Sequence, residues 1–220
     1  MILDCLLTEK VIESICLGIY RVYREKSWYK KDEGGAHMKK IGIFMADGCE
    51  EIEGLTVVDI VRRAKFEITT ISITGKTEVT GSHNIIFHAD ALSSEVNYDE
   101  LDGIVLPGGM PGTLNLGANE TVNAVIKKFA EEGKLVAAIC AAPSVLGAAG
   151  ILNGKKAACH PGFEEKLTGA QVVYQNVAVD GNVITSRGMG TAIDFALAIA
   201  EYFTDEETVS QVVQGLVYSR

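Results

Sequence analysis

The chain has 220 residues, 47% of them hydrophobic and 22% charged, which suffices for one globular domain with a deep core and an enclosed pocket. This composition excludes a disordered or repetitive protein. The net charge of −9 excludes a nucleic-acid-binding surface, because phosphate binding requires clustered lysine and arginine. The five cysteines form no CxxC pair, and a chain of this size does not need disulfides to fold, so we predict a reducing, cytoplasmic location.

Residues 1–38 differ from the rest of the chain. Acidic and basic residues balance there, so the whole net charge lies on residues 39–220. Apolar residues recur at helical spacing, but Glu13 and Arg21 interrupt them, and the run is too short and too polar to span a membrane. We therefore predict an N-terminal extension over 1–38, a single domain over 39–220, and Met38 as the physiological start.

From Lys39 onward, short apolar runs alternate with helical stretches, which is typical of a parallel sheet covered by helices on both faces. A hairpin is predicted at Asp180-Gly181, and a short antiparallel pair within residues 78–88. In such sheets, ligands bind beyond the carboxyl ends of the strands. The predicted strands are 41–46, 66–73, 103–106 and 135–139, the hairpin strands are 177–179 and 183–185, and the closing helices are 191–202 and 206–214.

Cys140 follows one predicted strand and precedes a helix that Pro143 opens. A nucleophile on such a turn is held in a strained, exposed conformation, and the small residues Ala138 and Ala142 allow strand and helix to cross closely. The helix N-terminus is expected to favour the thiolate over the thiol. The structural alternative is a buried core cysteine, the commoner role of a cysteine in an apolar run.

Glu53 lies in the predicted first helix, directly after the first strand. At helical spacing it shares a face with Val57, Ile60 and Val61, which directs its carboxyl group toward the interior. Because burial of an unpartnered carboxylate costs several kcal/mol or forces protonation, this glutamate is either a hydrogen-bonded structural residue or a functional one. A protonated Glu53 can donate to a thiolate at Cys140.

A glycine pair, Gly108-Gly109, ends a third strand. Paired glycines often only form a turn, but their N–H groups can also approach a ligand closely. Together with the N–H of Ala141 they can form an oxyanion site beside the cysteine. No Gly-Lys-Ser or Gly-Lys-Thr follows, which excludes a phosphate-binding P-loop.

Five motifs taken together resemble the ThiJ/PfpI superfamily, in the branch of the parkinsonism-associated protein deglycase (DJ-one) and its bacterial relatives. The resemblance runs in order from about Lys39 to Leu216 and excludes the extension. The motifs are residues 47–53 (DGCEEIE), 105–109 (VLPGG), 137–143 (AAICAAP), 159–161 (CHP) and 185–192 (TSRGMGTA).

The resemblance implies a flavodoxin-like α/β fold, a doubly wound, mostly parallel sheet sandwich like that of class I glutamine amidotransferases, in a single domain that normally forms a homodimer. It implies that Cys140 is the nucleophile and an oxidation-sensitive thiol, with Glu53 hydrogen-bonded to it. His160 corresponds to the family's nearby histidine, and Gly109 and Ala141 to its anion-binding amides. It implies no cofactor and no metal.

The chain departs from the family pattern at several positions. Ala141 stands where protease-like relatives carry a histidine after the nucleophile, which argues against peptidase activity. Met189 replaces a frequent proline, and His83 and His88 stand where the best-studied member has Arg and Cys. Functions that depend on those groups are not transferred to this chain.

Two hypotheses from different classes follow. The first is a glyoxalase III or protein deglycase that acts on α-oxoaldehydes such as methylglyoxal, or on their adducts, through Cys140, Glu53 and His160. The second is a peroxide-sensing redox protein or holdase chaperone, in which Cys140 is oxidised and Glu53 hydrogen-bonds the product. The same residues serve both hypotheses, so the sequence does not separate them. Neither needs a membrane or nucleic acid.

Overall fold

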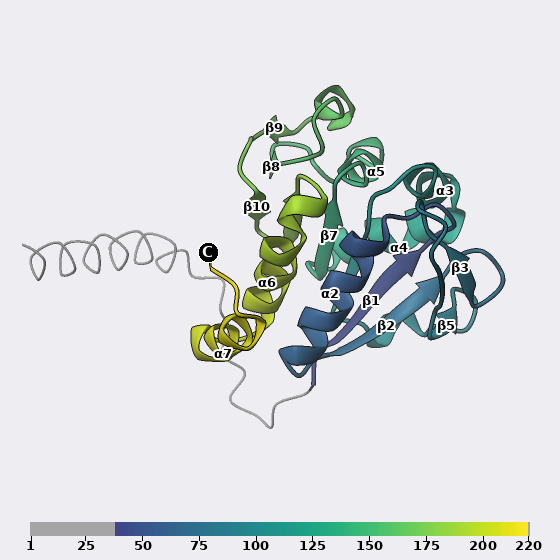
Figure 1. Ribbon diagram of the computed structural model, residues 1–220. Helices are drawn as coiled ribbons and strands as arrows, with labels where there is room; N and C mark the ends of the chain where they lie inside the picture. The colour runs from purple at the N-terminus through teal and green to yellow at the C-terminus, as the bar shows by residue number, and fades with distance from the viewer. Residues whose placement is uncertain (1–37, 220) are drawn as a thin grey trace, which may run out of the picture. The chain divides into compact units, whose positions relative to one another are not determined.

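The computed structural model describes residues 38–219. Its main element is a seven-stranded sheet with the order β10-β11-β7-β6-β1-β2-β5, in which every neighbouring pair is parallel except the antiparallel pair β10 and β11 (Figure 1). The strands are β1 (Lys40–Met45), β2 (Glu67–Ser72), β5 (Ala91–Leu92), β6 (Gly103–Leu106), β7 (Leu135–Ile139), β10 (Val177–Asp180) and β11 (Val183–Ser186).

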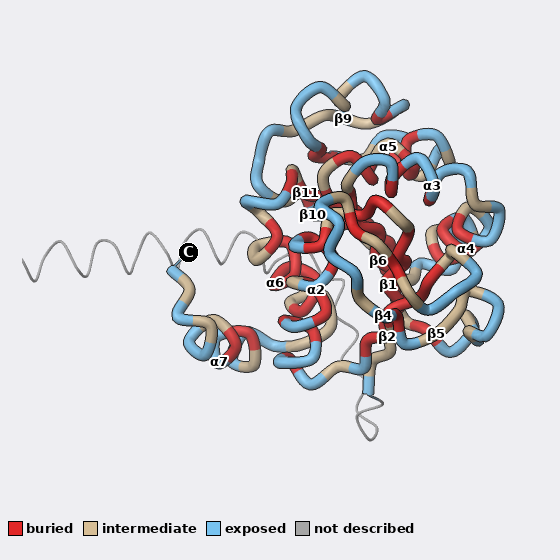
Figure 2. The backbone as a smooth tube through the Cα atoms, turned by 45° about the vertical axis from the view of Figure 1, so that its right-hand side comes forward, coloured by how far each residue is buried: buried red, intermediate tan, exposed pale blue. Residues whose placement is uncertain are grey.

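Helices cover both faces of this sheet, as predicted for a doubly wound fold. One apolar core packs α2, α6 and α7 against the sheet, and a second core packs α3, α4 and α5 against the other face. Figure 2 shows the buried backbone concentrated between these layers. The helices are α2 (Glu51–Arg63), α3 (Gly112–Ala118), α4 (Glu120–Glu131), α5 (Pro143–Ala148), α6 (Ala192–Phe203) and α7 (Glu206–Leu216), with 3₁₀ turns η1 (Tyr98–Glu100), η2 (Glu164–Lys166) and η3 (Met189–Thr191).

The central strands are apolar along their whole length because helices bury them on both sides. Every residue of β6 and β7 is buried, and so are five of the six residues of β1. The prediction of these strands is confirmed: β6 and β7 have the predicted bounds, and β1 and β2 each begin one residue from the predicted start.

Both predicted hairpins are also present. Asp180 pairs with Val183 across a turn in which Gly181 has a φ of 63°, a conformation that favours glycine. β3 (Glu78–Thr80) pairs antiparallel with β4 (Ile86–His88). A second small sheet, formed by β8 (Lys156–Ala157) and β9 (Gln171–Val172), was not predicted, nor was β5. The predicted extension lies outside the described residues except for Met38, its last residue.

Candidate active site

Cys140 lies at the turn between β7 and α5, with a φ of 65°. Residues with a side chain seldom adopt this left-handed conformation, so the surrounding structure must hold it. Two backbone hydrogen bonds do so: the N–H of Cys140 donates to the carbonyl of Ser186 over 3.0 Å, and the N–H of His160 donates to the carbonyl of Cys140 over 2.8 Å. The turn is therefore clamped between the end of β11 and the loop that carries His160.

Glu53, the third residue of α2, is 1% exposed. It shares the interior face of the helix with Val57, Ile60 and Val61, as the helical spacing predicted. The N–H of Gly108 donates to its Oε2 over 2.9 Å, and the carboxyl group is hydrogen-bonded to the thiol of Cys140. The structure thus brings the two predicted residues into direct contact.

Gly188, after the end of β11, marks the point on which three side chains converge. A Cβ placed on it would lie 3.9 Å from Cys140 Sγ, 3.8 Å from Glu53 Oε1 and 3.5 Å from His160 Cδ2. His160 is exposed, and its Nδ1 lies 2.9 Å from the carbonyl oxygen of Pro161. The sequence analysis placed Gly188 within a family motif but did not identify it as a wall of the site.

The Gly108-Gly109 turn also packs closely against Cys140 and Glu53. The N–H groups of Gly109 and Ala141 are hydrogen-bonded to the sulfur of Cys140 itself. A Cβ on Gly108 would lie 2.6 Å from Cys140 Cβ and 2.7 Å from Glu53 Oε2, so only glycine fits between the two groups. Sequence reasoning proposed these glycines for their N–H groups, whereas the close approach of Gly108 is visible only in the fold.

The pKa values of the pair depend mainly on burial. Burial raises the pKa of the Glu53 carboxyl to about 7, although the hydrogen bonds from Cys140 and Gly108 lower it. Burial and the adjacent Glu53 raise the pKa of the Cys140 thiol to about 12, although the N–H groups of Gly109 and Ala141 lower it. This rise is opposite to the lowered pKa expected from the helix N-terminus alone. Because carboxylate and thiolate repel one another, the two groups share a single proton above about pH 7.

The other described cysteines are less accessible. Cys49 and Cys159 are buried, whereas Cys140 is partly exposed. Burial raises the pKa of the Cys49 thiol to about 12 and that of the Cys159 thiol to about 11. Among the three, Cys140 alone combines contact with a carboxyl group, two amide donors and access from solvent.

Within residues 38–219, one group of three His, Asp, Glu or Cys side chains is close enough together to hold a metal ion: Glu50, Glu51 and His83. It does not include Cys140, Glu53 or His160. That the Cys140 site works without a cofactor stays a prediction.

Comparison with known proteins settles the family. The sequence pattern of the DJ-1/PfpI family matches residues 39–202. The chain belongs to this family. It is 37% identical over 177 residues to the protein dj-1beta of Drosophila melanogaster, covering 80% of this chain and 95% of that protein. A protein from Thermococcus kodakarensis that is named a deglycase is 36% identical over 154 residues, covering 69% of this chain and 91% of the relative.

Solved structures of DJ-1/PfpI proteins have the same fold. The crystal structure of Drosophila melanogaster DJ-1beta superposes with a TM-score of 0.81 at 35% identity, covering 84% of this chain and all of that one. The structure described as oxidized DJ-1 of Toxoplasma gondii gives a TM-score of 0.80 at 33% identity, covering 83% of this chain and all of that one. The flavodoxin-like α/β fold is therefore confirmed.

The chain is also 41% identical over 181 residues to the DJ-1 homolog B of Arabidopsis thaliana. This match covers 81% of this chain but only 41% of that relative, so the chain spans less than half of the relative's length.

Within residues 38–219, none of the helices combines the length and the apolar character needed to cross a membrane.

Proposed function

We propose that this DJ-1/PfpI protein is a cysteine-dependent, cofactor-free enzyme that converts α-oxoaldehydes such as methylglyoxal into hydroxyacids, a glyoxalase III activity, or hydrolyses their adducts as a deglycase. The observation that carries the proposal is the contact between the Glu53 carboxyl and the Cys140 thiol on a clamped turn. Family membership, with a relative named a deglycase, supports an enzymatic role.

The first step is addition of the Cys140 sulfur to the aldehyde carbon. A new carbon–sulfur bond forms, the carbonyl π electrons move to oxygen, and the proton held by the pair passes from Glu53 to that oxygen. The product is a hemithioacetal. The N–H groups of Gly109 and Ala141 already point at the sulfur, and they stabilise negative charge on it and on the oxygen one bond away.

The second step moves hydrogen within the substrate. Glu53, now ionised, removes the proton from the former aldehyde carbon and returns it to the neighbouring keto carbon through an enediol, with His160 assisting. This leaves a thioester of the hydroxyacid on Cys140. Water then hydrolyses the thioester, which releases the hydroxyacid and restores the thiol. The aldehyde carbon is oxidised and the keto carbon is reduced by equal amounts, so no external electron acceptor is needed.

The test is hydroxyacid formation from methylglyoxal by the full-length protein, with Cys140→Ala beside the matched variants Cys49→Ala and Cys159→Ala. We expect the rate to fall to that of buffer in Cys140→Ala alone, and dialysis against a chelator to leave the wild-type rate unchanged. A Cys140→Ala protein that is as active as the wild type would rule the proposal out.

A peroxide-sensing role is the second candidate, and the differing exposure of the cysteines favours it. Cys140 is partly exposed while Cys49 and Cys159 are buried, so among the three cysteines within residues 38–219 the thiol of Cys140 is the most accessible to peroxide. Oxidation by two equivalents of peroxide gives a sulfinic acid, with release of water, and Glu53 is in place to hydrogen-bond the added oxygen. Mass shifts confined to Cys140 after mild peroxide treatment, with no turnover of oxoaldehydes, would favour this role.

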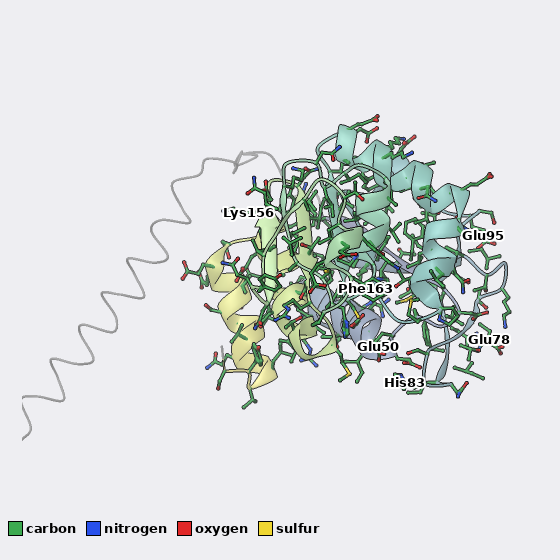
Figure 3. The ribbon with its side chains drawn as sticks, turned by 90° about the horizontal axis from the view of Figure 1, so that it is seen from above. Glu50, Glu78, His83, Glu95, Lys156 and Phe163 are labelled. Carbon is green, nitrogen blue, oxygen red and sulfur yellow. The ribbon has the colours of Figure 1, made fainter. Side chains whose placement is uncertain are left out.

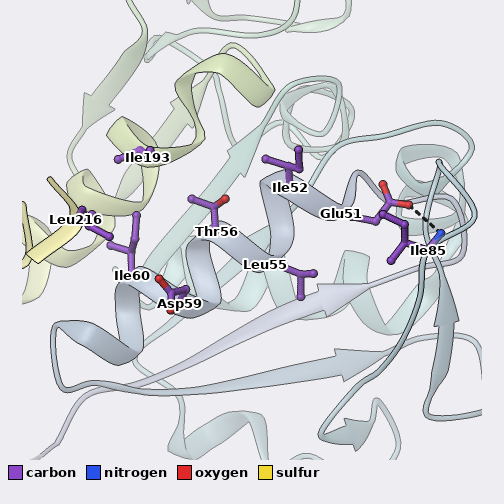
Figure 4. Close-up of a pocket in the computed structure, with 9 residues that line it drawn as sticks. All are labelled: Glu51, Ile52, Leu55, Thr56, Asp59, Ile60, Ile85, Ile193 and Leu216. Carbon is purple, nitrogen blue, oxygen red and sulfur yellow. Dashed lines mark hydrogen bonds between the residues drawn. The ribbon is translucent and has the colours of Figure 1, made fainter. Parts of the chain in front are cut away.

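The predicted homodimer has a surface that suits it. A groove of about 470 Å³ follows the outer side of α2, between the β3–β4 hairpin and the C-terminal helices (Figure 4). Ile52 and Ile85 on this face are 51% and 55% exposed, and they line the groove together with other apolar side chains. We assign a second copy of the chain to this face. Ile52→Glu should then yield monomers in analytical ultracentrifugation, whereas Val179→Glu, at a similarly exposed position on β10, should not.

A further inference from the structure

A cluster of polar side chains lies at the start of α2, outside the site described above. Glu51 is the first residue of the helix, Glu50 is the N-cap that precedes it, and His83 comes from the turn between β3 and β4. His83 Nδ1 lies 3.1 Å from Glu51 Oε2 and 3.5 Å from Glu50 Oε2, and one ligand atom from each residue lies within 4.8 Å of the others. Figure 3 shows Glu50 and His83 close together.

Glu51 is held in place by the hairpin. Its Oε1 accepts the backbone N–H groups of His83, over 2.8 Å, and of Ile85, over 3.4 Å. A Cβ on Gly81 would lie 2.2 Å from the same oxygen, so the loop wraps the carboxyl group closely. Oxygen Oε1 is therefore occupied by backbone donors. Oxygen Oε2 is left to face His83 and the hydroxyl of Ser82, which lies 3.3 Å away.

Ser82 adds a fourth atom that could serve as a metal ligand. Its Oγ lies 3.0 Å from His83 Nδ1 and 3.1 Å from Glu50 Oε2. Zinc is bound by imidazole nitrogen and carboxylate oxygen at about 2.0–2.1 Å, and in a tetrahedral site such bonds place neighbouring ligand atoms about 3.3 Å apart. The distances from His83 Nδ1 to the two carboxylates fall on either side of this value. These separations suit one small cation, and they are equally those of the hydrogen bonds that join the same atoms.

The charges and the access also fit a divalent cation. Two carboxylates face one imidazole, so neutral His83 leaves the cluster with two negative charges and protonated His83 leaves it with one. In a single chain the His83 side chain is 66% exposed, so solvent reaches the imidazole there. Ion pairing with protonated His83 is the alternative use of the same atoms. The two differ chemically because only a metal ion requires the imidazole lone pair.

We propose that Glu50, Glu51 and His83 bind a divalent transition-metal ion of the Zn²⁺ type, with Ser82 or water as the fourth ligand. The backbone N–H groups on Glu51 Oε1 hold this ligand in place, as outer hydrogen bonds do in established metal sites. The ion joins the first turn of α2 to the β3–β4 hairpin. The site needs neither Cys140 nor turnover of any substrate.

The test is isothermal titration of the tag-free, full-length protein with Zn²⁺, in wild type, His83→Arg, His88→Ala and Cys140→Ala. Arginine keeps a positive charge opposite the two carboxylates but cannot donate a lone pair to a metal. We expect one Zn²⁺ per chain at this site, at least about tenfold weaker binding in His83→Arg, and unchanged binding in His88→Ala and Cys140→Ala.

Cobalt provides a second readout that does not depend on folding stability. Co²⁺ at Glu50, Glu51 and His83 should show weak visible bands without the intense near-ultraviolet absorption of a metal–thiolate bond. Equal Zn²⁺ affinity in wild type and His83→Arg would overturn the proposal. So would loss of binding in Cys140→Ala alone, since that would place the metal on the cysteine, and so would the absence of binding in wild type.

Discussion

Glu51 and Glu53 lie two residues apart on α2, and solvent reaches neither of them appreciably, at 3% and 1% exposure. Their pKa values nevertheless shift in opposite directions. Burial alone would raise the pKa of Glu51, but hydrogen bonds from its own N–H and from His83 hold it at about 2. Burial raises the pKa of Glu53 to about 7, because few donors compensate it.

The difference follows from the geometry of the helix. Two residues turn an α-helix by about 200°, so the two side chains leave on nearly opposite sides. Glu51 points to the β3–β4 hairpin, where backbone N–H groups stabilise its charge, while Glu53 points into the core and meets Cys140. Exposure alone therefore does not identify a functional carboxyl group. The number of hydrogen-bond donors around it separates a fixed anion from a group that can exchange a proton near neutral pH.

Among changes that keep Glu51, Glu53 and Cys140 themselves, the largest effect is expected from Gly108→Ala, which forces Glu53 and Cys140 apart. The new Cβ would lie within 2.7 Å of both side chains, so the pair must move, and activity should fall at least about a hundredfold because reacting groups lose their alignment. The measurement is the rate of hydroxyacid formation with methylglyoxal. Gly190→Ala is the matched control, since a Cβ there meets nothing within 4 Å. Equal rates in the two variants would show that the close approach at Gly108 is not needed.

The second-largest effect is expected in the pH dependence of the free energy of unfolding, to which Glu53 and Glu51 contribute in opposite ways. The pKa of Glu53 is about 7 in the folded state against an ordinary value of 4.5, so its contribution to stability is present below pH 4.5 and is lost as the pH rises through 7. The loss is at most about 3 kcal/mol between pH 5 and pH 8. Urea unfolding at both pH values should show this loss in wild type and not in Glu53→Gln. A wild type and a Glu53→Gln variant with parallel profiles would contradict the raised pKa.

Glu51→Gln should lower the free energy of unfolding by a smaller amount, and its effect should appear near neutral pH and vanish in acid. The amide keeps one acceptor for the N–H of His83 but loses the charge, so we expect a loss of about 1–3 kcal/mol at pH 7. Because the folded-state pKa of Glu51 lies below its ordinary value of 4.5, its contribution is present above pH 4.5 and is lost as the pH falls toward 2. Chemical unfolding between pH 7 and pH 3 measures this. A Glu51→Gln protein as stable as wild type at pH 7 would contradict a stabilising role for the contact between the Glu51 carboxylate and the β3–β4 hairpin.

The smallest effect is expected from His83→Ala in metal-free buffer. The imidazole is two-thirds exposed, and ion pairs of exposed groups are screened by salt. The melting temperature should change slightly at low ionic strength and not at all in high salt. A large, salt-independent drop would mean that His83 stabilises the hairpin through packing rather than charge.

The sequence predicted much of this site because its elements are local. The apolar runs that become β6 and β7 end at Leu106 and Ile139, so the glycine turn and Cys140 could be placed at strand ends. The interior position of Glu53 followed from helical spacing. These predictions needed only the periodicity of neighbouring residues.

The remaining features depend on residues that are distant in sequence. The pKa of the Cys140 thiol had the opposite shift from the prediction, because burial beside Glu53 outweighs the first turn of the six-residue helix α5. Gly188 gave no signal as a wall of the site, because its role depends on the approach of α2 and the His160 loop. β5, at Ala91–Leu92, is too short for a periodic pattern to reveal.

The central claim is that Glu53 and Cys140 act as one proton-sharing pair, and the pH dependence of methylglyoxal turnover by wild type and Glu53→Gln tests it most directly. Wild type should gain activity as the pH rises through about 7, where the pair loses its first proton and holds one between its two groups. Glu53→Gln should be slower by about a hundredfold or more and should lack that inflection. A Glu53→Gln enzyme with the wild-type rate and the wild-type pH profile would contradict the account.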